Sequence, residues 1–184
     1  MRVISGTAKR HNLKTLEGLE TRPTLDRIKE TLFNIMPMDL YDKDFLDLFS
    51  GSGAIGIEAL SRGAKSATLV DNNPKCTEII KRNLIHTKLV DKATIYTMQV
   101  DKAIEKLVVE GKKFDIIFID PPYNKGIINF SLKKLLECDI ILKEECYIII
   151  ESSQNEIWDN YENLETCKIK DFKLTKITVL RCNF

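Results

Sequence analysis

The stretch of sequence that decides the fold is Phe45-Leu46-Asp47-Leu48-Phe49-Ser50-Gly51-Ser52-Gly53-Ala54-Ile55-Gly56. Its first part, as far as Phe49, has the mainly apolar pattern of a buried strand, and the rest fits G-x-G-x-x-G ahead of a helical segment at 57–62. Glycines at such a turn let the backbone approach a ligand closely, and Asp71, about 20 residues further on, is placed to bind both hydroxyls of a ribose. A tight strand-to-helix turn without a ligand is the alternative interpretation.

Strands and helices alternate on both sides of this stretch. Apolar runs predict strands at 45–49, 67–70, 94–96, 114–119 and 147–150, and apolar spacings of three and four predict helices at 25–36, 57–62, 74–86, 102–109 and 129–138. Two last strands, at 167–172 and 176–181, are joined by too few residues for a helical crossover, so we expect an antiparallel hairpin. The prediction is an α/β fold with a mostly parallel, doubly wound sheet that binds ligands beyond the carboxyl ends of its strands.

The N-terminal segment has a different pattern from the rest of the chain. Residues 2–15 alternate weakly, with possible turns at Gly6 and at His11-Asn12, which predicts a small β-hairpin outside the main core. Basic residues gather here without an acid among them, although the formal net charge of the whole chain is only +1: Arg2, Lys9, Arg10 and Lys14. They form either a solvated face or a surface that contacts phosphates. Arg22, Arg27 and Lys29 continue the basic character into the first helix.

Composition narrows the class of protein. Hydrophobic residues make up 43% and charged residues 30%, which is ordinary for one globular domain. The five cysteines are scattered and include no C-x-x-C pair, so we expect neither a metal site nor a disulfide framework. No stretch has the length of a signal peptide's apolar region or of a membrane span, and we therefore expect a cytoplasmic protein, working as a monomer.

A second motif, Asp120-Pro121-Pro122-Tyr123, follows the apolar run at 114–119 and so lies where a buried strand ends. An amine on an aromatic base is a poor nucleophile because its lone pair is delocalised into the ring. The Asp120 carboxylate and the Pro121 carbonyl can accept the two N–H groups of such an amine, and Tyr123 can stack on the base, with Pro122 stiffening the turn. The motif predicts catalysis mainly by positioning, with charge stabilisation added by Asp120.

The second reactant must be bound by the glycine loop. By itself this loop fits either a dinucleotide or S-adenosylmethionine. Two features favour S-adenosylmethionine. Asp47 is a polar residue inside the first strand, positioned to orient the glycine loop or to reach the ammonium group of the ligand. A hydride-transfer enzyme has no evident use for the motif at Asp120, whereas transfer of a methyl group to an exocyclic amine does.

Together these motifs and Arg22-Pro23-Thr24-Leu25-Asp26-Arg27-Ile28-Lys29-Glu30-Thr31-Leu32-Phe33-Asn34 resemble the bacterial RsmD-like enzymes, which methylate guanine N2 in 16S ribosomal RNA with S-adenosylmethionine. The resemblance implies a Rossmann-like methyltransferase domain at 41–184 and an RNA-contacting extension at 1–40. It implies a ribosomal RNA or small-subunit assembly intermediate as partner, contacted by Arg2, Lys9, Arg10, Lys14 and Arg22. It implies these cofactor-binding residues: Thr24, Arg27, Asp47, Phe49, Ser50, Gly51, Ser52, Gly53, Asp71, Asn72 and Asp101.

Other readings stay open at the level of sequence. Adenine N6 in DNA or a protein amide presents the same pair of N–H groups to Asp120. An oxidoreductase could bind a dinucleotide through the same glycine loop, and a non-catalytic RNA-binding module could retain the fold. The intact motif from Asp120 to Tyr123 argues against the last of these.

Overall fold

The structure, a computed structural model, describes residues 1–16, 23–138 and 142–183. The helices are α1 (Pro23–Ile35), α2 (Ala54–Ser61), α3 (Pro74–Thr87), η1 (Val90–Lys92), α4 (Val100–Val109) and α5 (Ile127–Glu137). The strands are β1 (Asp44–Asp47), β2 (Ser66–Asp71), β3 (Ala93–Thr97), β4 (Phe114–Ile119), β5 (Leu142–Ser153), β6 (Leu164–Asp171) and β7 (Thr175–Cys182). All the predicted elements are present, but β5 is much longer than the predicted strand at 147–150, and η1 was not predicted.

The strands form one sheet in the order β3-β2-β1-β4-β5-β7-β6. The first five strands of this order run parallel, while β7 is antiparallel to both of its neighbours, β5 and β6. Strand order reverses at β1, which pairs with β2 on one side and with β4 on the other. The connections that follow β1 and β4 therefore leave the sheet in opposite directions and open a crevice at the carboxyl ends of the two strands.

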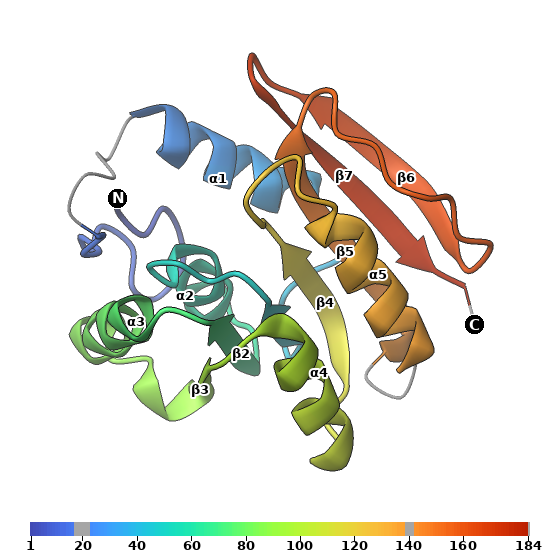
Figure 1. Cartoon of the computed structure of the whole chain (residues 1–184). Helices are drawn as coiled ribbons and strands as arrows, with labels where there is room; N and C mark the ends of the chain where they lie inside the picture. The colour runs from blue at the N-terminus through green and yellow to red at the C-terminus, as the bar shows by residue number, and fades with distance from the viewer. Residues whose placement is uncertain (17–22, 139–141, 184) are drawn as a thin grey trace.

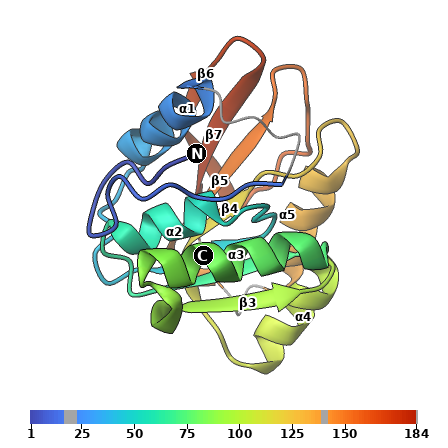
Figure 2. The same ribbon diagram turned by 90° about the vertical axis from the view of Figure 1, so that its left-hand side faces the viewer.

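Helices cover both faces of the sheet, with α1, α2 and α3 on one side and α4 and α5 on the other (Figures 1 and 2). Each face has its own buried apolar cluster. Every residue of β4 is buried, as expected for a central parallel strand that is covered on both faces. The predicted Rossmann-like fold, including the C-terminal hairpin of β6 and β7, is confirmed.

The N-terminal segment packs more closely than its sequence suggests. It folds back on itself, but its only bridge among the described residues joins Arg2 to Asn12. The prediction that it lies outside the main core is wrong, because Val3, Ala8 and Leu13 are buried in the same apolar cluster as α1, α2 and α3. The weak alternation of apolar residues in this segment thus marks the side that packs on the domain.

A buried carboxylate ties this segment to the domain. Glu58 of α2 accepts hydrogen bonds from the backbone N–H groups of Ile4 and Ser5, at 2.8 and 3.0 Å. It also pairs with the ammonium of Lys29 at 3.1 Å and with the guanidinium of Arg62 at 2.8 Å. Burial lowers the pKa of Lys29, while Glu58 opposes that shift. Since α2 directly follows the glycine loop, the N-terminal segment and α1 are anchored next to the candidate site.

Candidate active site

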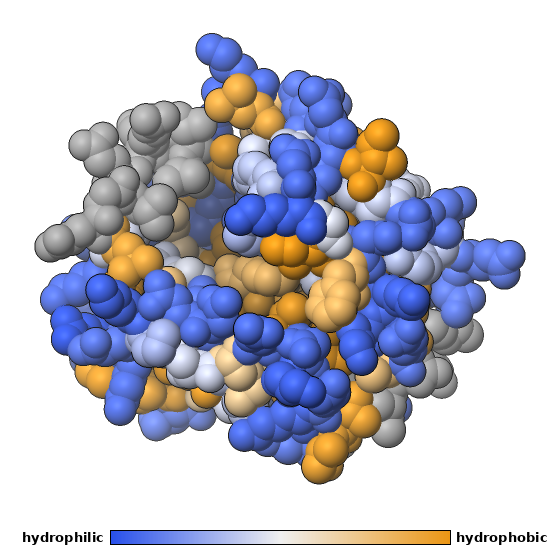
Figure 3. All heavy atoms as spheres, viewed as in Figure 1, coloured by the Kyte–Doolittle hydropathy of each residue, from blue (hydrophilic) through white to orange (hydrophobic). Residues whose placement is uncertain are grey.

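The candidate site lies at the carboxyl ends of β1 and β4, where two pockets adjoin. The first pocket lies between α1, the glycine loop and the ends of β4 and β5, and the second lies between the ends of β1 and β2 and the starts of α4 and α5. Phe49 and Asp120 line both pockets and so form the wall between them. Figure 3 shows a hollow with apolar side chains in the middle of this face, bordered by hydrophilic ones.

The glycine loop is held open by hydrogen bonds to its neighbours. Gly51 and Gly53 have φ angles of 54° and 78°, a left-handed conformation that glycine adopts at little cost. The N–H of Gly51 donates to the Asp71 carboxylate at 2.8 Å, and the Ser50 hydroxyl donates to the backbone carbonyl of Asp47 at 2.9 Å. A Cβ at Gly56 would lie 2.8 Å from Leu69, so this glycine lets α2 pack closely on β2.

Asp47, at the end of β1, is a buried acid that lines the first pocket. Neither of its carboxylate oxygens has a hydrogen bond of ordinary geometry with any described residue. Burial raises the pKa of Asp47 to about 7, although the nearby N–H groups of Gly56 and Phe49 and the Ser50 hydroxyl counteract part of the shift. An unpaired buried carboxylate is costly, and a cationic group in the pocket would remove that cost.

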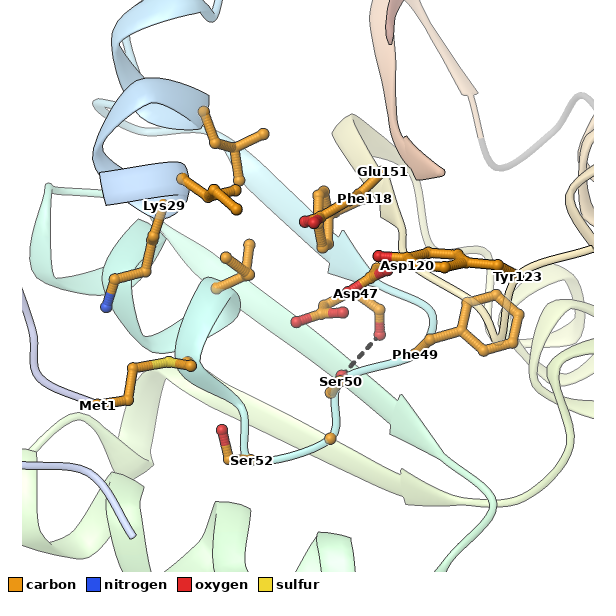
Figure 4. A pocket seen from close by; sticks show the side chains of 15 residues that line it. Met1, Lys29, Asp47, Phe49, Ser50, Ser52, Phe118, Asp120, Tyr123 and Glu151 are labelled. Atoms are coloured by element: carbon orange, nitrogen blue, oxygen red, sulfur yellow. Dashed lines mark hydrogen bonds between the residues drawn. The ribbon is translucent and has the colours of Figure 1, made fainter. Parts of the chain in front are cut away.

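The second motif places three polar side chains around the same pocket. Asp120, Tyr123 and Glu151 all line it, and Figure 4 shows the carboxylates of Asp120 and Glu151 pointing into it. Burial, then the charges of Glu151 and Asp47, raise the pKa of Asp120 well above its ordinary value. Burial also raises the pKa of Glu151 and of Tyr123, whose hydroxyl hydrogen-bonds Glu151.

Sequence reasoning missed Glu151. It directly follows the apolar run at 147–150, just as Asp120 follows the run at 114–119, so its position at a strand end was a usable signal. The structure extends β5 to Ser153 and brings Glu151 next to the motif.

The loop after the motif is supported from behind by the connection that follows β5. Asn124 has a φ of 58°, and its backbone N–H donates to the buried Glu156 carboxylate at 3.0 Å. The Ser153 hydroxyl donates to the Asn124 side chain at 3.1 Å. These contacts fix the exit of the chain from the motif and so help to hold Asp120 and Tyr123 in place.

The second pocket combines polar groups with apolar walls. Asp71 and Asn72 follow β2, Asp101 lies in the first turn of α4, and Met98 and Phe130 supply apolar surface. Asp71 uses both of its carboxylate oxygens, since it accepts the N–H of Gly51 and, at 2.8 Å, the N–H of Asn73. Each oxygen has a further lone pair that can accept a hydroxyl.

The structure brings most of the predicted residues to these two pockets. The first holds Asp47, Phe49, Ser50, Gly51, Ser52, Asp120 and Tyr123. The second holds Phe49, Asp71, Asn72, Asp101, Asp120 and Pro122. Gly53 shapes the turn before α2, and Pro121 is buried at the start of the motif loop without lining either pocket.

Arg27, predicted near the cofactor or its target, lies elsewhere. It lines a separate groove on the outer side of α1 with Arg2, Lys9 and Arg10. The α1 residues that line the first pocket are Ile28, Lys29 and Leu32. Lys14 does not line this groove. Its backbone N–H and carbonyl form hydrogen bonds with the side chain of Asn83 in α3. Arg22 and the side chain of Thr24 lie outside the described part of the chain.

The residues that the structure describes include no helix long and apolar enough to cross a membrane. They also include no group of three or more histidine, cysteine or acidic side chains that could hold a metal ion.

Comparison with known proteins identifies the family. A family model described as "Conserved hypothetical protein 95" matches residues 1–181. The chain belongs to this family. A curated relative, "Ribosomal RNA small subunit methyltransferase D" of Escherichia coli, is 34% identical over 153 residues, which are 83% of this chain and 74% of the relative. The resemblance inferred from the sequence motifs is confirmed.

Solved structures support the same assignment of the fold. "Putative methyltransferase yhhF" from Escherichia coli is similar with a TM-score of 0.85 and 28% identity, covering 100% of this chain and 98% of that one. The protein SMU.776, described as a methyltransferase complexed with SAH, has a TM-score of 0.66 and 18% identity over 84% of this chain and 48% of its own. At that identity the second likeness concerns the fold alone.

Proposed function

We propose that this protein uses S-adenosylmethionine to methylate the exocyclic N2 amine of a guanine in small-subunit ribosomal RNA. The observation that carries the proposal is the position of Asp120 in the wall between the two pockets. A cofactor that spans the pockets and an amine that enters the first pocket would both contact this residue. Methyl transfer between two bound reactants requires such a shared wall.

The residues of both pockets fit the cofactor. Asp71 and Asn72 would bind the ribose hydroxyls, Asp101 would meet the adenine amine, and Met98 and Phe130 would pack on the adenine ring. In the first pocket the unpaired carboxylate of Asp47 would bind the ammonium group of the methionine part. Besides its carboxylate, the ligand carries an ammonium and a sulfonium, and these two positive charges suit a pocket with the buried carboxyl group of Asp47 and the half-buried ones of Asp120 and Glu151.

S-adenosylmethionine supplies a methyl group on positively charged sulfur: the new N–C bond forms as the S–C bond breaks, and the S–C electron pair stays on sulfur. Asp120 would accept one hydrogen of the guanine amine, which directs the nitrogen lone pair out of the ring plane, and would then hold the proton that the amine loses. The sequence also predicts the Pro121 carbonyl as an acceptor, but Pro121 lines neither pocket, so the proposal relies on Asp120 to bind the amine. Tyr123 would pack on the base and fix its angle of approach.

Ribosomal RNA as the substrate is supported by the name of the curated relative and by the charge of the groove beside α1. Four cationic side chains line that groove together with the acids Asp26 and Glu30, of which Asp26 pairs with Arg2 at 3.2 Å, so cations outnumber acids by two. Cations that contact phosphates supply most of the non-specific affinity for RNA, and those of the groove are Arg2, Lys9, Arg10 and Arg27. The target guanine must leave its stack to reach Asp120, which costs a few kcal/mol and is cheapest in a loop. A ribosomal substrate would place the enzyme in the cytoplasm, where ribosomal subunits are assembled.

The test is to incubate the protein with methyl-labelled S-adenosylmethionine and unmodified small subunits, assembly intermediates or naked 16S RNA. We expect label in one nucleotide of one of these substrates, identified as N2-methylguanosine by mass spectrometry. The Asp120→Ala variant should incorporate none. Label on adenine or on protein, or equal label with the variant, would refute the proposal.

A further inference from the structure

Glu151 is a second carboxylate beside Asp120 whose position follows from the pairing of β4 with β5. The strands are parallel, and Ile119 is paired with Ile150, so the next residues, Asp120 and Glu151, leave neighbouring strands side by side. Adjacent parallel strands lie about 4.8 Å apart. Figure 4 shows both side chains entering the first pocket. An amine held by Asp120 would therefore have Glu151 within reach of the neighbouring atom of its ring.

The first pocket has independent marks of a ligand site. Asp47 is 1% exposed and lines the pocket with both carboxylate oxygens unpartnered by any described residue. Lys29 also lines the pocket, but its ammonium is engaged by Glu58 and by the backbone carbonyl of Arg2. Close to Asp120 and Glu151 the donor of the protein's own is the Tyr123 hydroxyl, while the N–H groups of Gly56 and Phe49 and the Ser50 hydroxyl lie near Asp47. The natural complement of these acids is a ligand that presents several N–H groups in a row.

Guanine, adenine and a protein amide all carry an NH2 group, but they differ in the hydrogen-bonding atom that lies next to it. In guanine the N2 amine stands beside N1–H, so two neighbouring donors point the same way. In adenine the N6 amine stands beside an unprotonated N1, and in a protein amide the NH2 stands beside a carbonyl oxygen. A second carboxylate at that place attracts the guanine edge and repels the other two.

We propose that Glu151 accepts the N1–H of the target guanine while Asp120 accepts a hydrogen of its N2 amine, so that Glu151 selects guanine. This inference rests on the proposed function and assigns a specificity-determining role to a residue outside both sequence motifs. The Tyr123 hydroxyl, which hydrogen-bonds Glu151 in the free protein, orients the carboxylate before the base arrives. The two N–H donors of guanine then offset the burial of the two acids.

The experiment compares two RNAs that carry either guanine or 2-aminopurine at the nucleotide that the wild-type protein methylates. 2-Aminopurine keeps the amine at position 2 but has no hydrogen on N1. We expect kcat/KM of the wild type to favour guanine by about 100-fold or more, because a site built for a donor rejects an analogue that lacks it. If the wild type methylates both RNAs equally well, Glu151 does not read N1.

Glu151→Gln changes the preference without changing the shape of the side chain. Its amide oxygen can still accept from guanine, and its NH2 can donate to N1 of 2-aminopurine, so we expect the preference to fall to about 10-fold or less. The matched control is Glu162→Gln, an exposed glutamate outside both pockets, which should keep the wild-type preference. A Glu151→Gln protein that keeps the wild-type ratio would overturn the inference.

Tyr123→Phe separates direct reading of the base from a structural effect. It removes the hydroxyl that hydrogen-bonds both Glu151 and Asp120 and leaves the two carboxylates in place, so the guanine preference should persist even where the rate falls. If Tyr123→Phe lowers the preference as much as Glu151→Gln does, Glu151 acts only by holding the tyrosine and the inference fails. A wild type that methylates neither RNA, nor any guanine of the ribosomal substrates, contradicts the proposed function itself, and the inference falls with it.

Discussion

Asp47 makes cofactor binding depend on pH. Its pKa in the ligand-free protein is raised to about 7 by burial, from an ordinary value of 3.8. A bound ammonium group favours the ionised carboxylate and brings the pKa back down. Near neutral pH the cofactor must therefore displace a proton from Asp47, and the affinity for S-adenosylmethionine should fall as the pH falls through about 7.

The size of the effect follows from linkage. For one group that titrates at about pH 7 in the free protein and well below that in the complex, the dissociation constant rises about fivefold from pH 7 to pH 6 and about twofold from pH 8 to pH 7. Burial raises the pKa of Asp120 and Glu151 as well, so their protons add to the dependence in the same direction.

The stability of the free protein should change in the opposite sense. Because the folded state keeps a proton on Asp47 that the unfolded chain has already lost, the free energy of unfolding should decrease as the pH rises from about 4 through about 7.

Isothermal titration calorimetry in buffers of different ionisation enthalpy measures both the affinity and the protons released. Asp47→Asn should weaken binding at neutral pH by about 30-fold, the loss of one charge-assisted hydrogen bond, and flatten the pH dependence. Asp91→Asn, at an exposed acid in η1, is the matched control and should bind as the wild type does. If Asp47→Asn keeps the wild-type pH dependence, the ammonium group does not bind at Asp47.

Four further outcomes follow from the structure. Asp120→Ala should lower the rate of methyl transfer by about 1000-fold with little change in cofactor affinity by calorimetry, because its carboxylate acts on the amine. Changing Lys9 and Arg10 together to Ala should weaken RNA binding and lower the slope of log affinity against log salt by about two, in filter-binding titrations. Gly6→Ala should destabilise the fold by about 3 kcal/mol or more in urea unfolding, since Gly6 has a φ of 81° and a Cβ there would lie 1.7 Å from the Ser61 carbonyl oxygen. Finally, S-adenosylmethionine should tighten binding of the target RNA more than S-adenosylhomocysteine does.

Two of these outcomes have matched control variants. Ala at both Lys112 and Lys113 removes the same charge from an exposed loop before β4, and an equal loss of RNA affinity there would show that the groove beside α1 is not the RNA surface. Gly111→Ala meets no atom within 4 Å at a φ of 63°, so it should cost only about 1 kcal/mol. A Gly6→Ala protein as stable as this control would mean that the segment is not docked on α2. If S-adenosylmethionine and S-adenosylhomocysteine tighten RNA binding equally, the sulfonium charge has no role in binding the target base.

The sequence predicts the sheet and its helices well because the central strands carry apolar runs, the last two strands alternate, and the helices have regular apolar spacings. β1 is shorter than predicted and ends at Asp47, where the chain turns to form the glycine loop. The two motifs could be placed in one site from sequence alone, since parallel strands bring their carboxyl ends to the same edge. Local sequence patterns are sufficient to predict a feature when that feature depends on one strand or helix alone.

The rest depends on contacts between distant parts of the chain. Glu151 lies at a strand end that carries no motif, and only the pairing of β4 with β5 shows that it stands beside Asp120. Val3 is buried in the core, and the backbone N–H groups of the two residues after it donate to Glu58 of α2, which lies far from them in the sequence. Arg27 carries the right charge for either a cofactor or an RNA, and only the direction of its side chain from α1 assigns it to the outer groove.

Three acids in one pocket also link the two substrates. In the free protein, burial raises the pKa of Asp47, Asp120 and Glu151, and the charges of Glu151 and Asp47 add to the shift at Asp120. A protonated carboxyl is a poor acceptor for the N–H groups of guanine. A bound sulfonium and ammonium lower those pKa values and leave the carboxylates that the base requires. The cofactor therefore prepares the acceptor pocket, and by reciprocity the target base tightens the charged cofactor more than its neutral product. After transfer the sulfur would be neutral while the ammonium group still pairs with Asp47, so only the contribution of the sulfonium charge to ionising Asp120 and Glu151 would be lost, which would favour release of the methylated base.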